Sequence, residues 1–189
     1  MTAPLVKKAH QKMAVYLKAA DYAIDATMGN GYDTVFLAEK VGQQGKVYAF
    51  DLQSLALTAT DARLGDKGLS ERVKLIHGNH KDLARYLADD KVESVRCIVF
   101  NLGYLPGSDK IIQTSPQSTV QALNSALSSL QKPGIISVLA YTAHIGGRQE
   151  AEAVKEWALV LDKQQYRVTI EVPPVVKQSP PELILIESI

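Results

Sequence analysis

Two closely spaced glycines follow a short apolar segment and precede a helical pattern. The segment Tyr22-Ala23-Ile24 leads into the stretch Asp25–Thr34, which contains Gly29 and Gly31, and Val35 to Ala38 begins the helical pattern. Glycine tolerates positive φ angles and lets a ligand approach the main chain without a Cβ in the way. In an open α/β sheet, a glycine turn between a strand and a helix is where a nucleotide-like cofactor binds. The stretch therefore predicts a cofactor site.

Acidic residues at the ends of the first two predicted strands indicate which cofactor this is. Asp51 closes the apolar segment Lys46–Phe50, where a carboxylate can accept hydrogen bonds from both hydroxyls of a ribose. A dinucleotide fingerprint needs a third small residue three positions after the second glycine, but Thr34 stands there. Asp25, before the turn, would repel a pyrophosphate and attract the ammonium end of a methionine moiety. The pattern favours S-adenosylmethionine over NAD.

Polar side chains in the turn and after the next two strands extend the predicted cofactor site. A polar group after the third strand can bind the amino group of adenine, and His80 can stack or hydrogen-bond beside it. For Gln53 and Asn79, a structural role at the start of a helix is an alternative of similar weight. The predicted cofactor-binding residues are Asp25, Thr27, Gly29, Asn30, Gly31, Asp51, Gln53, Asn79 and His80.

The stretch from Asn101 to Gly107, which reads Asn-Leu-Gly-Tyr-Leu-Pro-Gly, ends the fourth predicted strand. The amide oxygen of Asn101 can accept a hydrogen bond from a substrate N–H and aim the nitrogen lone pair at a methyl group. Tyr104 can stack on a planar base and shield the reacting atoms from water. A turn with an Asn cap and a buried Tyr is the alternative. The stretch predicts a site that methylates an amine.

The fifth strand and the basic residues supply the remaining candidates. Tyr141 and His144 follow that strand, ahead of a predicted glycine turn. His144 can act as a base or contact a nucleic acid, although histidines in loops are as often neither. Lys8 and Lys12 on an N-terminal helix and Lys110 in the loop after Asn101 are candidate substrate contacts; a solvated face is the alternative. We expect catalytic roles for Asn101, Tyr104 and His144, substrate contacts from Tyr104, Lys110, Tyr141, His144, Lys8 and Lys12, and no metal.

The elements that must position these residues alternate along the chain. Strands are predicted near 22–26, 46–51, 72–76, 95–101 and 134–140, and helices near 4–20, 32–42, 53–65, 81–88, 116–131 and 147–163. Such alternation predicts a parallel sheet with right-handed crossovers. The last two strand-like runs, 167–172 and 182–187, have no helix between them and should pair antiparallel. We expect an α/β, Rossmann-like fold, with seven mostly parallel strands, one antiparallel strand near the edge and helices on both faces.

Length and composition fit a single domain. The 189 residues are 46% hydrophobic and 22% charged with a net charge of +1, so no global basic field points to nucleic acid. We expect one domain over 1–189, made of an N-terminal helix (1–20) and a core (21–189). The single cysteine, Cys97, lies in an apolar run and fits a buried core residue in a reducing compartment. Without a signal peptide or a bilayer-length apolar stretch, a soluble, cytoplasmic protein is expected.

Three motifs together resemble one small bacterial family. They are the Asp-Ala-Thr-x-Gly-Asn-Gly-x-Asp-Thr turn, the loop that begins at Asn101 and the His-x-Gly-Gly stretch at His144. The sequence resembles class I S-adenosylmethionine-dependent N-methyltransferases of tRNA wobble uridine, whose members were long labelled rRNA methylases. The resemblance extends from His10 to the Pro180-Pro181 pair. One departure is Tyr32, where the family pattern has His, which puts a proton-handling role of that position in doubt.

The resemblance implies methylation of 5-aminomethyl-2-thiouridine at the wobble position, with the tRNA anticodon arm as the partner. An alkylamine with a pKa of about 10 is mostly protonated at neutral pH, so the site must favour its neutral form. Asn101 can orient the amine but cannot take its proton, and His80, His144 and Tyr104 all remain candidate relays. Other readings are a methyltransferase acting on rRNA or a small amine, a nicotinamide oxidoreductase, and a non-catalytic module that binds S-adenosylmethionine. A homodimer also remains open.

Overall fold

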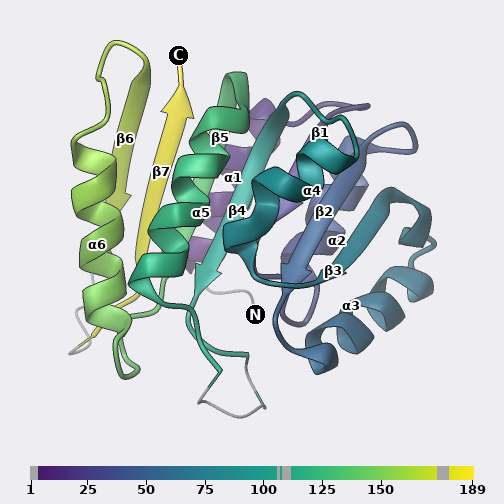
Figure 1. The fold of residues 1–189 in the computed structure, drawn as a ribbon, viewed down its shortest axis with the longest axis horizontal. Helices are drawn as coiled ribbons and strands as arrows, with labels where there is room; N and C mark the ends of the chain where they lie inside the picture. The colour runs from purple at the N-terminus through teal and green to yellow at the C-terminus, as the bar shows by residue number, and fades with distance from the viewer. Residues whose placement is uncertain (1–3, 106, 108–111, 174–178) are drawn as a thin grey trace.

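The structure is a computed structural model that describes residues 4–105, 107, 112–173 and 179–189. Its centre is a seven-stranded sheet with the strand order β3-β2-β1-β4-β5-β7-β6 (Figure 1). The strands are β1 (Tyr22–Asp25), β2 (Lys46–Asp51), β3 (Val73–His77), β4 (Val95–Leu102), β5 (Leu130–Ala140), β6 (Tyr166–Glu171) and β7 (Glu182–Ser188). Only β7 runs against its neighbours, pairing antiparallel with both β5 and β6. The predicted sheet, with one reversed strand near its edge, is confirmed.

Helices cover both faces of the sheet, as predicted. They are α1 (Pro4–Tyr16), α2 (Tyr32–Val41), α3 (Ser54–Asp66), α4 (Leu83–Asp89), α5 (Pro116–Ser129) and α6 (Gly147–Leu159), with short 3₁₀ turns η1 (Ser70–Arg72) and η2 (His80–Asp82). One hydrophobic core lies between the sheet and α1, α2 and α3, and a second lies under α4, α5 and α6 (Figure 1). Successive strand residues alternate between these cores, so Ala23 joins the first and Ile24 the second.

Three element boundaries differ clearly from the sequence prediction. Helix α1 ends at Tyr16 rather than near residue 20. Beyond it, the N–H of Lys18 donates to the Asp21 carboxylate at 2.7 Å and Ala20 has a φ of 69°, neither of which continues a helix. Strand β5 begins at Leu130, before the predicted start, because this residue already pairs with β4 ahead of an irregularity in the register. Helix α6 ends at Leu159 rather than near residue 163, and the other boundaries agree with the prediction to within two residues.

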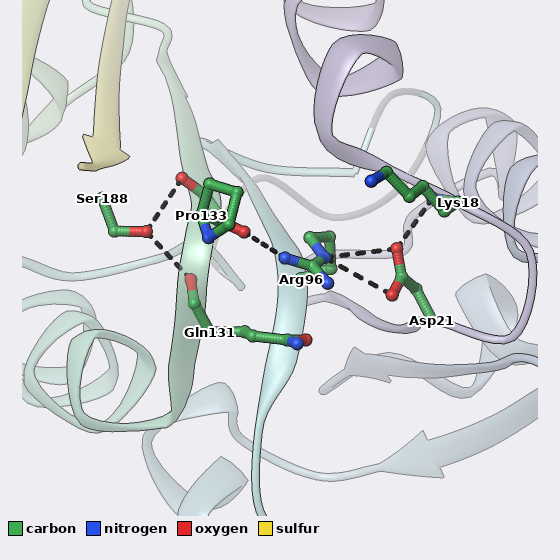
Figure 2. Close-up of polar contacts among 7 residues, drawn as sticks. Lys18, Asp21, Arg96, Gln131, Pro133 and Ser188 are labelled. Atoms are coloured by element: carbon green, nitrogen blue, oxygen red, sulfur yellow. Dashed lines mark hydrogen bonds and ion pairs between the residues drawn. The ribbon is translucent and has the colours of Figure 1, made fainter.

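A polar cluster joins the elements at the amino ends of the parallel strands (Figure 2). The Arg96 Nε donates to both carboxylate oxygens of Asp21 at 3.3 and 3.4 Å, and its Nη1 donates to the carbonyl of Pro133. The hydroxyl of Ser188 donates to the carbonyl of Gln131 at 2.9 Å. The side chains of Arg96 and Asp21 are each only 12% exposed. The cluster lies at the amino ends of the strands, whereas the predicted site residues follow their carboxyl ends, so we interpret it as structural.

Candidate active site

The carboxyl ends of the central strands open onto a cavity of about 1320 Å³. Single drug-sized ligands occupy pockets of about 300–1,000 Å³, so this cavity has room for a cofactor and part of an acceptor. The predicted site residues that line it are Thr27, Gly29, Asn30, Asp51, Gln53, Asn79, His80, Asn101, Tyr104, Tyr141 and His144. Asp25, Gly31, Lys8 and Lys12 are not among its lining residues.

Glycine is required at the two positions of the turn for different structural reasons. Both adopt positive φ angles, 50° at Gly29 and 78° at Gly31. A Cβ on Gly31 would lie 2.8 Å from the Oγ1 and 3.0 Å from the Cα of Thr60 on α3, so this glycine lets α3 pack against the turn. A Cβ on Gly29 would make only ordinary contacts, the nearest at 3.5 Å from Leu105. Gly29 lines the cavity, and because it has no side chain, a ligand there can approach the backbone.

Asp51 is held at the end of β2 by two backbone donors. The N–H of Gly29 donates to Oδ2 and the N–H of Gln53 to Oδ1, both at 3.0 Å. Burial raises the pKa of Asp51, while these backbone hydrogen bonds act in the opposite direction. Each carboxylate oxygen keeps a further lone pair, so the group can still accept two hydroxyl donors. This arrangement suits a ribose, and binding by the Gln53 side chain stays a prediction.

Asp25 lies beneath the turn rather than in the cavity. Its side chain is fully buried, and it accepts hydrogen bonds from the Thr34 hydroxyl at 2.6 Å and from the Thr27 N–H at 3.2 Å. Burial, together with the negative charge of Asp33, raises the pKa of Asp25 to about 7. The residue thus fixes the shape of the turn, and its predicted attraction of an ammonium group stays a prediction.

Asn79 and His80 follow β3 and differ in their roles. Asn79 Oδ1 accepts a hydrogen bond from the Lys81 N–H at 3.0 Å, so the structure shows the capping role that was the alternative predicted from the sequence. His80 Nδ1 lies 3.2 Å from the carbonyl oxygen of Ala26. Because a carbonyl can only accept, Nδ1 carries the proton in this contact. Burial lowers the pKa of His80 to about 4, and its buried Nε2 has no partner among the described residues. It is an acceptor suited to an amino group.

Asn101 is tied to two other elements at the end of β4. Its backbone N–H donates to Thr27 Oγ1 and its side-chain Nδ2 donates to Asp33 Oδ2, both at 2.6 Å. The second Asp33 oxygen makes a short contact with His10 Nε2, which brings α1 into the site. Neither Asp33 nor His10 is among the site residues predicted from the sequence. The signal for Asp33 was an acidic residue directly after the glycine turn, in the first turn of a helix.

Tyr104, Tyr141 and His144 form the wall of the cavity beyond β4 and β5. The tyrosine side chains are half-exposed, and the rings of Tyr104 and His144 meet edge to face at 5.9 Å. His144 Nδ1 lies 3.1 Å from Gln113 Oε1 and 3.0 Å from the Ile145 carbonyl oxygen, so this nitrogen carries the proton. The buried Nε2 of His144 has no partner in the described part of the chain. His144 thus offers an acceptor, as His80 does, and the identity of the proton relay stays open.

Lys8 and Lys12, two of the predicted basic contacts, do not line this cavity. Lys8 pairs with Glu171 on β6, at the far edge of the sheet. Lys110 lies outside the described residues, and contacts of Lys8, Lys12 and Lys110 with a substrate stay predictions. Within the described ranges, no group of three or more His, Cys, Asp or Glu residues is placed to hold a metal ion. Of the helices described, none combines the length and apolar character needed to cross a bilayer.

Comparison with known proteins places this geometry in a family. Residues 47–187 match the family described as "Putative rRNA methylase". A chloroplastic tRNA (mnm(5)s(2)U34)-methyltransferase from Arabidopsis thaliana is 38% identical over 156 residues, which cover 78% of this chain and 56% of that protein. The chain spans about half the length, or less, of the curated relatives it matches.

Solved structures extend the similarity over the whole chain. A protein from Clostridium thermocellum described as a putative rRNA-methylase is 36% identical, with a TM-score of 0.93 and complete coverage of both chains. A putative methyltransferase from Streptococcus mutans, crystallised in complex with SAH, is 34% identical, with a TM-score of 0.88 and complete coverage of both chains. Since the family match extends over most of the sequence, this chain belongs to the "Putative rRNA methylase" family and has the fold of class I S-adenosylmethionine-dependent methyltransferases.

Proposed function

We propose that this protein transfers a methyl group from S-adenosylmethionine to the primary amine of a 5-aminomethyluridine at the tRNA wobble position, and that residues 1–189 act as one domain. The observation that carries the proposal is Asn101 at the end of β4, whose side-chain NH₂ is bound by Asp33 and whose amide oxygen is left for an N–H donor. The Arabidopsis thaliana relative, by its name, acts on the same tRNA position.

The cavity fits the cofactor on chemical grounds. Asp51 offers lone pairs to a ribose diol, Gly29 leaves its backbone accessible, and the unpartnered Nε2 of His80 can accept a hydrogen bond from an amino group such as that of adenine. When bound, S-adenosylmethionine supplies a methyl carbon activated by a positive sulfonium. The protein's own side chains then have to place the amine and keep it neutral.

The acceptor half of the cavity suits an amine carried on a planar base. Asn101 is an acceptor for an amine N–H, which leaves the nitrogen lone pair free to attack. The half-exposed rings of Tyr104 and Tyr141 can stack on uracil and exclude water. A dry site disfavours the charged ammonium, and His144 and Tyr104 are the candidate relays for its proton. Burial lowers the pKa of His80 to about 4, so His80 suits a hydrogen bond from the adenine amino group better than the uptake of a proton. With its lone pair, the amine attacks the methyl carbon as the bond from that carbon to sulfur breaks.

A tRNA anticodon arm is the partner that this reaction requires. A wobble nucleotide already lies in a single-stranded loop, so presenting it costs less than flipping a base out of a duplex. The net charge of +1 means that the arm must be held by local contacts rather than by a global basic field. We propose Lys8, Lys12 and Lys110 as contributors, with Lys8 giving up its ion pair with Glu171.

The test has two steps. Calorimetric titration with S-adenosylmethionine should show binding, and incubation with tRNA that carries unmethylated 5-aminomethyl-2-thiouridine should give a methylaminomethyl nucleoside by mass spectrometry. Asn101→Ala should bind the cofactor and form little product. Because the family description names rRNA, hypomethylated rRNA is the parallel acceptor. Product on rRNA alone would overturn the tRNA assignment, and absence of cofactor binding would overturn the methyltransferase assignment.

A further inference from the structure

We propose that Asp33 is a positioning residue that fixes the amide of Asn101 with its carbonyl oxygen available to the acceptor amine, and that His10 of α1 holds Asp33 in place. The inference rests on the proposed function, because it assigns the acceptor an N–H group. It adds the N-terminal helix to the reacting site, although neither His10 nor Asp33 belongs to the predicted catalytic set.

The orientation of the Asn101 amide follows from the chemistry of its partner. Asp33 Oδ2 lies 2.6 Å from Asn101 Nδ2. A carboxylate can only accept, so the amide must turn its NH₂ toward Asp33. An amide rotated by half a turn would place two oxygen atoms at that distance, which is repulsive. The Asn101 oxygen is therefore held on the side away from Asp33, and no described residue donates to it.

Asp33 is itself held from two sides. Its Oδ1 contacts His10 Nε2, and the His10 ring stacks on Phe36 with centroids 4.0 Å apart and planes 3° from parallel. The side chains of Asp33 and His10 are only 12% and 23% exposed. Asp33 also stands in the first turn of α2, where the helix N-terminus favours a negative charge. Packing and electrostatics thus leave the carboxylate little freedom.

A fixed amide matters because the oxygen and the NH₂ group of the Asn101 side chain have opposite effects on an amine. The oxygen accepts the amine N–H and directs the lone pair toward the methyl donor, whereas the NH₂ group would compete for that lone pair. Without Asp33, both orientations of the amide would be populated, and in one of them the amine would not be aimed at the methyl donor. A misplacement of about 1 Å in such sites costs on the order of 10²-fold in rate, so we expect a loss of similar size. The effect should appear in turnover and not in cofactor affinity.

The test compares three variants with the parent. Asp33→Ala should lower kcat on the aminomethyl tRNA by roughly 10–100-fold, while the Kd for S-adenosylhomocysteine stays within about threefold. Asp33→Asn retains an oxygen that can accept from Asn101, so it should recover most of the lost turnover. Asp61→Ala, which removes an exposed carboxylate on α3, is the matched control. Parental turnover in Asp33→Ala, or Asp33→Asn as impaired as Asp33→Ala, would overturn the positioning role.

A second readout does not depend on turnover. The side-chain NH₂ resonances of Asn101, identified by their loss in Asn101→Ala, should shift in Asp33→Ala because the donor loses its carboxylate partner. Resonances that do not move would overturn the inference even if turnover falls. If the parent methylates no tRNA but the resonances respond to Asp33→Ala, the proposed acceptor fails and the positioning of the Asn101 amide stands.

Discussion

Replacing Asp51 by Ala tests the cofactor half of the site. The Asp51 carboxylate accepts the backbone N–H groups of Gly29 and Gln53, each at 3.0 Å, and retains one lone pair on each oxygen for a ribose hydroxyl. Asp51→Ala removes the ribose acceptors and also releases the glycine turn from β2. We therefore expect weaker binding of S-adenosylmethionine and its demethylated product.

The size of the effect follows from the hydrogen bonds that are lost. A hydrogen bond to a charged group contributes about 1.5–3 kcal/mol net. Water entering the vacated space will replace part of that, so we expect a loss of about 1–3 kcal/mol in total. Since each 1.4 kcal/mol is a factor of ten, this corresponds to a rise in Kd of roughly 5- to 150-fold.

Calorimetric titration with S-adenosylhomocysteine measures this change directly and needs no tRNA. Asp61→Ala, an exposed position on the neighbouring helix α3, should bind as the parent does. Urea unfolding of both variants separates a weaker site from a less stable fold. An Asp51→Ala protein that binds with parental affinity would remove Asp51 from the cofactor site and refute the assignment of this cavity.

Other perturbations should have separate signatures. Asn101→Ala should reduce kcat strongly with cofactor affinity nearly unchanged, because its backbone N–H bond to Thr27 survives the substitution; parental methylation would refute its role. Arg96→Ala should lower the free energy of unfolding by about 2–3 kcal/mol in urea titrations, since it leaves the largely buried Asp21 carboxylate without its cation, and cofactor binding should be retained. Asp25 has a pKa of about 7 in the fold against an ordinary 3.8, so its contribution to stability is full below about pH 4 and is lost as the pH rises through 7. Asp25→Asn should flatten that fall, and an unchanged slope of unfolding free energy against pH would contradict the assignment.

The fold was readable because its determinants are local in sequence. Each buried strand is a short apolar run bounded by turn residues. The absence of a helical sequence pattern between 167–172 and 182–187 predicted the antiparallel pairing of β6 and β7. The boundaries were less readable where tertiary contacts decide them. The end of α1 depends on the Asp21 carboxylate that accepts the Lys18 N–H and also binds Arg96 on β4, and a helical pattern cannot reveal such a contact.

The same reasoning explains which site residues were found. Gly29, Asp51 and Asn101 stand at strand ends, where topology alone places them on one cavity. Asn79 and Asp25 were given ligand roles because their types fit, but their closest partners are backbone or hydroxyl groups of their own turns. His10 and Asp33 were not assigned to the site, because their contact spans 23 positions of sequence and the link from Asp33 to Asn101 spans 68.

The arrangement of partners divides the site into two halves that can be perturbed separately. The Asp51 side chain is bound by the backbone N–H groups of Gly29 in the glycine turn and of Gln53 at the start of α3. The Asn101 side chain is instead held by Asp33, which in turn contacts His10 on α1. The substitution Asn101→Ala keeps the backbone bond to Thr27, so it should not disturb the turn that Asp51 supports. When Asp51→Ala and Asn101→Ala are combined, the loss of cofactor affinity should equal that of Asp51→Ala alone and the loss of turnover that of Asn101→Ala alone, so that their free-energy effects add. Strong coupling between them would instead mean that the turn transmits cofactor binding to the amide that orients the amine.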